Sequence, residues 1–531
     1  LERVRDVGED LPAALLTSER LPLRADALAA IHRPRSLSEA EVGRVRLAFD
    51  ELLVLRLALL RTAAARERAS ALPLGEPGEL IARYRESLPF TLTPDQERAT
   101  TEIDADLDRT VPMQRLLQGD VGSGKTVVAF HALLVAVQGG HQGAFMAPTE
   151  ILAEQHYLGS RELLAGLSVP DSATLTGDRP VRVELLTNRT SAADRRRLAA
   201  ALKAREVDIV IGTHALIYGE VEFASLGVVV IDEQHRFGVE QREVLRGLGN
   251  DPDVLVMTAT PIPRTAAMLV YGDLDKSELR ELPPGRVPIA TEVVGDNALA
   301  RAAVHERLRA EVASGRQAYV VCPLVGGSDR TEARAAVEEF ARLGDEELAG
   351  LRLGLLHGQL PSREKEAVMA AFRAGELDVL VATTVVEVGV DVPNATVMVV
   401  EDADRFGLSQ LHQLRGRVGR GAVPSICFLL AEPTTREGRA RTEAMAASTD
   451  GFLLAERDLE IRGAGEVFGE RQAGFSDLKL GRLPRDEMLV LGARAAAEKI
   501  LDDDPQLERN EQLRQEVEDL LGDAVEFLFK S

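Results

Sequence analysis

Tryptophan is absent from this sequence, and aromatic residues make up only 4% of its 531 positions. Ala, Leu, Val and Arg dominate instead, which we attribute to a coding bias and not to function. Cysteine is nearly absent as well, because only Cys322 and Cys427 occur, each in an apolar run ("AYVVC" and "SICFLL"). Two isolated thiols argue against a disulfide, so we expect both to pack as small hydrophobic side chains in a reducing compartment.

The sequence also lacks a signal peptide and any apolar run of the ~20 residues that a membrane-spanning helix needs. We therefore expect a soluble, cytoplasmic protein. The first residue is Leu1 and not Met, so we expect the chain to begin inside a longer gene product. The composition, with 45% hydrophobic residues, is that of a globular protein. A chain of 531 residues is too long for a single core, and its length indicates roughly three or four domains of ~150 residues.

Positive charge is in deficit, and the formal net charge is −22. By itself this deficit argues against a polyanionic partner, because non-specific nucleic-acid binding depends on basic surface. Two arginine clusters, at 195–197 and 415–420, weaken the objection. An acidic protein can still carry a local basic track, and these clusters are the candidates for one.

Residues 1–88 are predicted to be helical. The stretch "EAEVGRVRLAFDELLVLRLALLRTAAARERA" carries apolar residues at helical spacing over a long span. Ser38 with Glu41 three positions later fits a helix N-cap with a capping box. No chemical motif appears here, and we expect a connecting or packing helix.

Two α/β units follow, at residues 89–283 and 284–449. Short apolar runs bounded by turns alternate with helical stretches, which indicates buried parallel strands in a layered fold. The Pro/Gly-rich "ELPPGR" (281–286) is the predicted linker between the two units. Residues 450–531 are charged and are predicted to be helical. No short-period repeat is visible in the sequence. The predicted strands are "GAFMAP", "VDIVIGT", "LGVVVIDE" and "DVLVMTAT" in the first unit, and "RQAYVVCPL", "LRLGLLHG", "LDVLVATT", "ATVMVVED" and "SICFLLAE" in the second.

Residues 119–126, "GDVGSGKT", match the pattern G-x-x-x-x-G-K-[ST] in full. The run "RLLQ" before them and the helical "VVAFHALLVAV" after them supply the strand–loop–helix context that this pattern requires. Glycines let backbone N–H groups close around phosphate oxygens, and the helix N-terminus adds a favourable dipole. Lys125 is predicted to neutralise the β- and γ-phosphates of ATP, and Thr126 to hold Mg²⁺. The predicted ATP-binding residues of this loop are Gly119, Asp120, Val121, Gly122, Ser123, Gly124, Lys125 and Thr126.

An acidic pair ends the strand-like run in "VVVIDEQH" (228–235). Asp232 can hold Mg²⁺ directly or through water, and Glu233 can activate the attacking water as a general base. An acidic pair after a strand is often only a solvated strand end. Beside a complete phosphate loop, the catalytic interpretation is favoured.

The second α/β unit has no phosphate loop and carries "QLHQLRGRVGRG" (410–421) instead. Such arginines could form a solvated basic helix face, or one of them could reach across a cleft as an arginine finger, which is worth ~10³–10⁵ in rate. Gln413, Arg417 and Arg420 are the candidates, with Arg420 preferred. A finger from a separate unit would couple hydrolysis to closing and opening of the cleft.

The motifs together resemble the complete series of a superfamily-two helicase, over about residues 90–475. The resemblance implies two tandem RecA-like P-loop motor domains with a helical N-terminal segment and a helical C-terminal extension, using ATP and Mg²⁺. The nine motifs, in order, are "FTLTPDQ" (90–96), "GDVGSGKT", "APTEILAEQH" (147–156), "GTHALI" (212–217), "DEQH" (232–235), "TATPIPRT" (258–265), "LLHGQL" (355–360), "VATTVVEVGVDVPNA" (381–395) and "QLHQLRGRVGRG".

Further site residues follow from this resemblance alone. Gln96 would read the adenine edge, and Gly389 and Asp391 would approach the nucleotide from the second domain. Small hydroxyl side chains would position a nucleic-acid backbone without reading its sequence. The implied contacts to the backbone are Thr149, Thr213 and Thr383, and "TAT", with Thr258 and Thr260, would link the ATP cleft to the nucleic acid.

Within the superfamily, "IDEQHRFGVEQR", "MTATPIPRT" and "HQLRGRVGRG" resemble the branch of the RecG helicases and the transcription-repair coupling factor. "DVPMQRLLQGDVGSGKT" and "ELPPGR" bring the chain nearer to RecG. RecG helicases carry an N-terminal wedge domain, a small β-barrel that engages branched DNA. The sequence shows no such barrel, and residues 1–88 resemble only the helical connector after it. We therefore expect the wedge to be removed, unresolved or naturally absent, and the sequence predicts no junction-binding domain within this chain.

The resemblance implies an ATP-dependent DNA helicase that moves on duplex DNA, regresses stalled replication forks and migrates branched junctions in recombination and repair. Its implied partners are forks, Holliday junctions and single-stranded DNA-binding protein, and its implied state is a monomer beside the bacterial nucleoid. A repair-coupling-factor motor, an RNA helicase and a non-enzymatic ATP-binding scaffold are the alternatives. A nuclease is disfavoured, because no further carboxylate cluster and no metal-ligand spacing such as H-E-x-x-H appears.

The stretch "AERDLEIRGAGEVFGERQAG" (455–474) follows the second motor domain directly. Alone it suggests a charged surface helix and loop. After the helicase motifs it resembles the translocation motif of RecG and the repair coupling factor, in which a helical hairpin and loop pass domain motion to duplex DNA. The implied coupling residues are Arg457, Arg462, Arg471 and Gln472.

Overall fold

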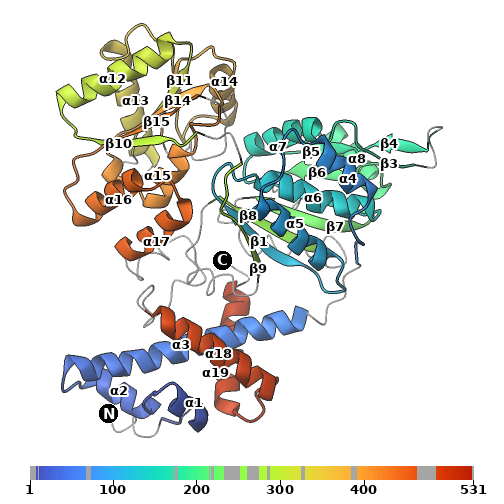
Figure 1. Ribbon diagram of the computed structural model, residues 1–531, viewed down its shortest axis with the longest axis vertical. Coiled ribbons are helices and arrows are strands. Elements are labelled where there is room, and N and C mark those ends of the chain that lie inside the picture. The colour runs from blue at the N-terminus through green and yellow to red at the C-terminus, as the bar shows by residue number, and fades with distance from the viewer. Residues whose placement is uncertain are drawn as a thin grey trace.

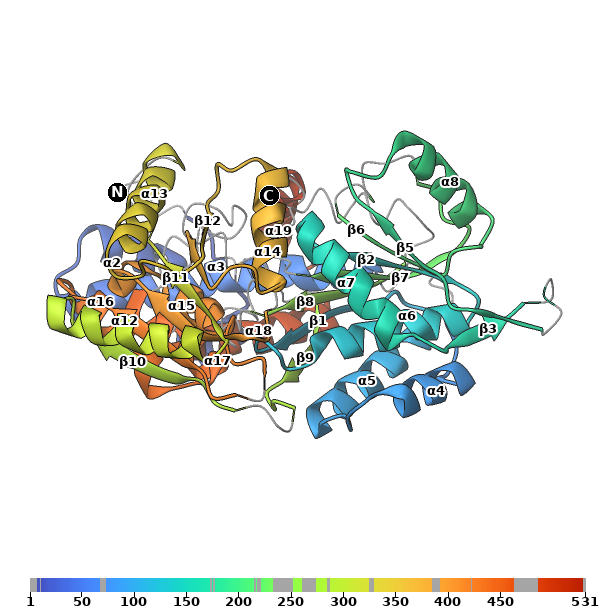
Figure 2. The ribbon, with the colours of Figure 1, turned by 90° about the horizontal axis from the view of Figure 1, so that it is seen from above.

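The structure, a computed structural model, consists of two α/β domains and a helical unit (Figure 1). We call the described residues within 73–283 domain 1, those within 287–462 domain 2, and residues 7–66 together with 486–528 the helical unit. Seen from above, the two domains lie beside each other over this unit (Figure 2). The described residues are 7–9, 11–66, 73–171, 174, 177–213, 216, 221–232, 252–259, 274–283, 287–323, 329–383, 392–421, 423–462 and 486–528.

Domain 1 is built on a seven-stranded sheet of order β5-β6-β2-β7-β8-β1-β9, in which every pairing is parallel. Its strands are β1 (Gln114–Gly119), β2 (Gln142–Met146), β5 (Val183–Leu186), β6 (Ile209–Gly212), β7 (Leu226–Asp232), β8 (Asp253–Thr258) and β9 (Asp275–Leu279). The helices are α4 (Glu79–Ser87), α5 (Pro94–Leu107), α6 (Lys125–Gln138), α7 (Glu150–Leu163) and α8 (Ala192–Lys203), and a separate antiparallel hairpin pairs β3 (Ser168–Pro170) with β4 (Asp178–Pro180).

Apolar runs make these strands because both faces of the sheet are buried. In β7, Val228 and Val230 belong to the core that includes α5 and α6, while Val229 and Ile231 belong to the core that includes α8. This alternation is what a parallel sheet between two helical layers requires. The predicted strands of domain 1 are thereby confirmed, whereas the short β5, the hairpin strands β3 and β4 and the polar "DKSEL" of β9 were not predicted.

Domain 2 contains a six-stranded parallel sheet of order β10-β15-β14-β11-β13-β12, and the strands predicted there are also confirmed. Its strands are β10 (Ala290–Val294), β11 (Gln317–Val321), β12 (Leu353–Leu356), β13 (Val379–Ala382), β14 (Ala395–Val400) and β15 (Ile426–Leu430). Its helices are α12 (Ala298–Ala313), α13 (Asp329–Asp345), α14 (Ser362–Arg373), the short η4 (Ala403–Arg405), α15 (Leu408–Arg415), α16 (Arg436–Ala447) and α17 (Gly451–Arg462).

The two cysteines lie in this second sheet region as free, buried thiols, as predicted. Burial raises the pKa of Cys427 to about 12, so its thiol stays protonated at physiological pH. Cys322 follows β11 and is equally shielded from solvent. Both side chains therefore act as small hydrophobic groups.

The two domains repeat one plan. The order β5-β6-β2-β7-β8-β1 in domain 1 corresponds to β12-β13-β11-β14-β15-β10 in domain 2. Individual hydrogen bonds repeat as well: Asp208 accepts the backbone N–H before β5 at 2.8 Å, and Asp378 accepts the N–H before β12 at 2.8 Å. Gln142 and Gln317, which begin β2 and β11, each donate to two backbone carbonyls of the segment that leads into the neighbouring strand, one in the last turn of α8 or α14 and one in the loop after it.

This repeat predicts a stabilising substitution. After α8, Arg205 adopts a left-handed conformation with φ 58°, and the position after α14 has the same conformation but holds Gly375, with φ 74°. A side chain in this region costs about 1 kcal/mol relative to glycine. Arg205→Gly should therefore stabilise domain 1 by about that amount, raising the midpoint of its thermal transition, while Gly375→Ala destabilises domain 2. A lower midpoint for Arg205→Gly would contradict this expectation.

The helical unit joins the two ends of the described chain. It packs α1 (Ala13–Ser18), α2 (Arg24–His32) and the long α3 (Leu37–Arg66) against α18 (Glu487–Asp503) and α19 (Glu511–Leu528), with one apolar core between them. Arg44 on α3 binds both carboxylate oxygens of Asp486 at 2.8 Å, and both side chains are buried. Because the pair is bidentate and shielded, it fixes the angle at which α18 starts on α3.

The N-cap of α3 differs from the predicted one. Ser36 Oγ accepts the N–H of Glu39 at 3.1 Å and caps the helix, so the assignment of Ser38 with Glu41 is wrong. Both serines are followed by a glutamate three residues later, and the sequence pattern cannot choose between them. Glu41 instead pairs with Arg44 at 3.0 Å within the helix.

The helix α4, which the sequence analysis placed in the N-terminal segment, packs into the core of domain 1 and is counted as part of it. Tyr84 donates its hydroxyl to Val127 O on α6 at 2.9 Å, and Leu80 and Ile81 join the core of domain 1. Among the described helices, none combines the length and apolar character that crossing a bilayer requires.

Candidate nucleotide site between the two domains

The predicted phosphate loop connects β1 to α6 at the carboxyl edge of the first sheet. Gly124 precedes α6 with φ 85°, a left-handed conformation that glycine adopts without steric cost. A Cβ at Gly119 would lie 2.4 Å from Ser123 Oγ and 2.9 Å from Leu279 Cβ, so only glycine fits there. The predicted strand–loop–helix arrangement is therefore present, with the turn closed tightly on itself.

The loop offers groups that suit a phosphate. Lys125 Nζ donates to Gly119 O at 2.8 Å and to Asp120 O at 3.0 Å, which holds the ammonium group over the loop. Ser123 Oγ is fully buried and, within the described residues, has no hydrogen-bond partner. The N-terminus of α6, Lys125 and two hydroxyl-bearing residues, Ser123 and Thr126, form a donor set that fits the phosphates of ATP with Mg²⁺.

Asp232 ends β7 on the same edge of the sheet. Its Oδ2 atom lies 2.9 Å from Nε2 of His156 on α7, and the histidine ring packs on Phe145 with ring centroids 4.5 Å apart. The Asp232 carboxylate is thus fixed in orientation through Oδ2, and within the described part of the chain no hydrogen bond to its other oxygen is found. Glu233 and Thr260, the other predicted residues of these strand ends, lie outside the described residues.

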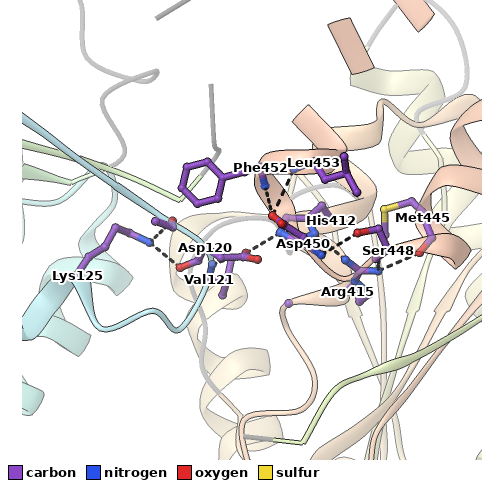
Figure 3. A network of polar contacts seen from close by, with 12 residues as sticks. Asp120, Val121, Lys125, His412, Arg415, Met445, Ser448, Asp450, Phe452 and Leu453 are labelled. Carbon is purple, nitrogen blue, oxygen red and sulfur yellow. Dashed lines mark hydrogen bonds and ion pairs between the residues drawn. The ribbon is translucent and has the colours of Figure 1, made fainter. Parts of the chain in front are cut away.

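Domain 2 approaches the phosphate loop through α15 (Figure 3). His412 Nε2 lies 2.6 Å from Asp120 Oδ1, and a Cβ at Gly416 would come within 3.1 Å of Val121 Cβ. Burial alone would raise the pKa of Asp120, but the hydrogen bond from His412, the Val121 N–H and the nearby positive charge of Lys125 together outweigh it, so the pKa lies below its usual value. Asp120 and Val121 of the phosphate loop therefore contact domain 2 directly, through His412 and Gly416.

The predicted arginines surround this contact. Arg420 Nε donates to Gly416 O at 3.2 Å, so its side chain is tied to the residue that touches the loop. Gln413 and Arg417 are buried next to it. Arg415 is also buried, so of the arginines at 415–420 only the half-buried Arg420 could contribute to the basic surface track that the sequence suggested. The arginines at 195–197 lie on α8, where Arg196 and Arg197 are exposed.

Gln96 lies beside the phosphate loop, at the start of α5. Its side chain forms a capping box with Thr93, accepting the Thr93 N–H at 2.9 Å, and its Nε2 atom donates to Ser123 O at 2.8 Å. Both ends of the amide are therefore engaged by the protein. The assignment of Gln96 to the adenine edge stays a prediction.

The predicted nucleic-acid residues occupy strand ends. Thr149 caps α7 by accepting the Leu152 N–H at 3.3 Å. Thr213 and Thr383 follow the equivalent strands β6 and β13, and both are buried, as is Thr258 at the end of β8. Arg457 on α17 is exposed and pairs with Glu460 at 2.6 Å. The side chain of Arg462, and Gly389, Asp391, Arg471 and Gln472, lie outside the part of the chain that the structure describes.

Known families match three consecutive segments. The DEAD/DEAH box helicase family matches residues 93–269, the helicase conserved C-terminal domain matches residues 300–422, and domain 3, C-terminal, of the ATP-dependent DNA helicase RecG matches residues 448–528. RecG of Bacillus subtilis (strain 168) is 45% identical over 497 residues, which cover 93% of this chain and 71% of that protein. The chain belongs to the RecG family of DNA helicases.

RecG of Synechocystis sp. (strain PCC 6803) is 46% identical over 527 residues, covering 98% of this chain but 62% of that protein. A solved structure of RecG bound to a three-way DNA junction matches with a TM-score of 0.74 and 42% identity, and the match covers 91% of this chain and 62% of that one. The chain therefore spans less than two thirds of both. RecG is favoured over the repair coupling factor and over an RNA helicase.

The structure adds two histidines that the sequence analysis did not single out. His156 orients Asp232, and His412 binds Asp120 across the two domains. Both stand inside helicase motifs quoted above, "APTEILAEQH" and "QLHQLRGRVGRG". The sequence could have singled out both histidines because each stands in a motif that borders the phosphate site. Their partners, Asp232 and Asp120, could not be named before the fold was known.

Proposed function

We propose that this chain is an ATP-driven motor that moves on duplex DNA, regresses stalled forks and migrates branched junctions. The observation that carries the proposal is the contact of the phosphate loop with α15, where Asp120 binds His412. A nucleotide in the loop would lie between two domains, so its hydrolysis would change how they meet. The RecG family named above supports DNA as the track.

The chemistry is assigned to groups on both sides of this contact. Lys125 neutralises phosphate charge, Glu233 takes a proton from the attacking water, and Arg420 stabilises charge on the transferring phosphoryl group. Mg²⁺, when bound, would neutralise charge between the β- and γ-phosphates, with Thr126 and Asp232 to hold it. Gln96, Gly389 and Asp391 complete the proposed nucleotide contacts, and Gln413 and Arg417 support Arg420.

The proposed DNA contacts come from the strand ends and from the segment after α17. Thr149, Thr213, Thr258, Thr260 and Thr383 would lie near the phosphate backbone, and Arg457, Arg462, Arg471 and Gln472 would pass domain motion to it. The proposed partners are forks and Holliday junctions, with single-stranded DNA-binding protein as a further one. The proposed state is a cytoplasmic monomer near the nucleoid.

The substrate preference of the ATPase tests this proposal. We expect ATP turnover to rise several-fold more with a fork or a four-way junction than with single-stranded RNA, and more with duplex DNA than with single-stranded DNA. The measurement is steady-state phosphate release at equal nucleotide concentration across these five substrates. Stimulation by RNA that equals or exceeds stimulation by branched DNA would support an RNA helicase instead.

A further inference from the structure

A continuous line of polar contacts leads from the phosphate loop to the helix α17 (Figure 3). Asp120 binds His412, and His412 Nδ1 lies 2.9 Å from Nη2 of Arg415, three residues later on α15. Arg415 Nη1 then donates to Met445 O at 3.0 Å and to Ser448 O at 2.8 Å. These carbonyls lie at the end of α16, directly before α17.

These contacts select one tautomer of His412. A guanidinium group can only donate, so Nδ1 of His412 must accept the hydrogen bond from Arg415. The single ring proton of neutral histidine is then on Nε2, where it is donated to Asp120 Oδ1. One tautomer thus satisfies both neighbours at once. The histidine connects an acceptor in domain 1 to a donor buried in domain 2.

The far end of the line caps α17. Asp450 N donates to Ser448 Oγ at 3.1 Å, and Asp450 Oδ1 accepts the backbone N–H groups of Phe452 at 2.8 Å and Leu453 at 3.3 Å. These N–H groups belong to the first turn of α17 and have no partner within the helix. The orientation of α17 therefore depends on the same short segment that Arg415 holds.

Domain 1 contacts this helix start at a second place. The guanidinium of Arg280 lies over the ring of Phe452, 4.5 Å from its centroid. Arg280 follows β9, and its backbone N–H donates to Asp95 Oδ2 at 2.8 Å, at the start of α5. Burial alone would raise the pKa of Asp95, but the N–H donors of Glu281 and Arg280 hold it below its usual value, so the anchor stays ionised.

We propose that His412 and Arg415 are positioning residues that tie the phosphate loop to the junction of α16 and α17, with Arg280 and Phe452 as a second tie. Phosphate binding would act on this line through Asp120, whose Oδ1 also accepts the neighbouring Val121 N–H at 2.6 Å. A phosphate oxygen that attracts this loop N–H competes with Asp120 for it. The inference rests on the proposed nucleotide site and deepens it, because it names the path to α17.

Burial makes the line stiff enough to transmit a displacement. Arg415 is 2% exposed and His412 is 6% exposed, and both pack inside domain 2. A buried guanidinium that lost its acceptors would be costly, so Arg415 should move together with the carbonyls that it holds. A shift of α15 relative to the phosphate loop would therefore be passed to the start of α17.

Hydrogen exchange on the whole chain tests the proposal without DNA. The probe is the non-hydrolysable analogue AMP-PNP with Mg²⁺, and the readout is amide exchange in peptides that cover residues 448–454. In the unaltered chain we expect AMP-PNP to change this exchange several-fold. His412→Leu should abolish the change while AMP-PNP still binds within a few-fold, and His412→Gln, which keeps a donor for Asp120, should restore part of it.

Matched variants exclude a general loss of structure. Arg439→Ala removes an exposed arginine from α16 and should leave the response intact. If His412→Leu fails to fold, Phe452→Leu tests the second tie, since it keeps an apolar side chain but loses the contact with Arg280. An AMP-PNP response equal in all variants, or no response in the unaltered chain that nevertheless binds AMP-PNP, overturns the proposal.

The movement of DNA separates this inference from the proposed function. DNA movement per ATP hydrolysed should fall at least several-fold in His412→Leu, whereas the control Arg439→Ala should match the unaltered chain. If the unaltered chain hydrolyses ATP but moves no DNA, the proposed function fails. If it moves DNA and His412→Leu moves it equally far per ATP, the motor stands and the positioning role fails.

Discussion

Lys125→Ala should reduce ATP hydrolysis by ~10²–10³-fold or more, to a rate near the detection limit. The ammonium group is held over the phosphate loop by Gly119 O at 2.8 Å and Asp120 O at 3.0 Å, where the transferring phosphate would lie. Lys125 is the cationic side chain of the loop, and it acts together with the backbone N–H groups of the loop. Without it, the charge that develops on the phosphates loses its fixed partner.

The fold should tolerate this substitution. Lys125 is the first residue of α6, alanine favours helices, and the lysine is only partly buried. The thermal midpoint should therefore stay close to that of the unaltered chain. Lys203→Ala, which removes an exposed lysine on α8, is the matched control and should hydrolyse ATP normally. Unchanged turnover in Lys125→Ala would remove the nucleotide site from this loop.

Arg420→Ala should lower the ATP hydrolysis rate by ~10³–10⁵-fold, the range known for arginine fingers, while ATP binding changes only a few-fold. Arg420 is tied to Gly416, which packs on Val121 of the phosphate loop, so its side chain begins next to the site in the other domain. A finger acts on charge that appears during phosphoryl transfer and much less on the bound ground state. This difference separates the loss of rate from the loss of affinity.

Arg420 gives a cleaner test than its neighbours. Arg417 is buried and Arg415 holds two backbone carbonyls, so replacing either would also disturb packing. Arg405→Ala is the matched control, because Arg405 is an exposed arginine of domain 2 that pairs only with Asp402 among the contacts described, at 3.4 Å. Single-turnover hydrolysis and nucleotide titration together measure both effects. A loss confined to DNA affinity would contradict the role of Arg420.

The sequence predicted those features that depend on a short stretch of chain. The loop from Gly119 to Thr126 carries its own conformation, since glycine spacing and the flanking strand and helix suffice for a phosphate cradle. The strands β7 and β14 were visible because both faces of each are buried and nearly every residue in them is apolar. The polar β9 was missed, because it is an edge strand and Asp275 and Glu278 give no strand pattern.

Contacts between distant segments could not be predicted in this way. Asp120 and His412 stand in two motifs almost three hundred positions apart, and only the shared cleft of the two domains brings them together. The sequence predicted roles for Arg417 and Thr213 but gave no sign that both side chains are buried. Side-chain exposure depends on the packing of whole domains, which spacing along the chain does not report.

The central claim is that ATP turnover between the two domains moves this chain along duplex DNA. Displacement of a third strand from a DNA triplex measures such movement directly, because the duplex stays paired and no unwinding is needed. We predict that the unaltered chain displaces the third strand with ATP but not with AMP-PNP, and that Lys125→Ala displaces none. Duplex-stimulated ATP hydrolysis that leaves the third strand in place would contradict the account.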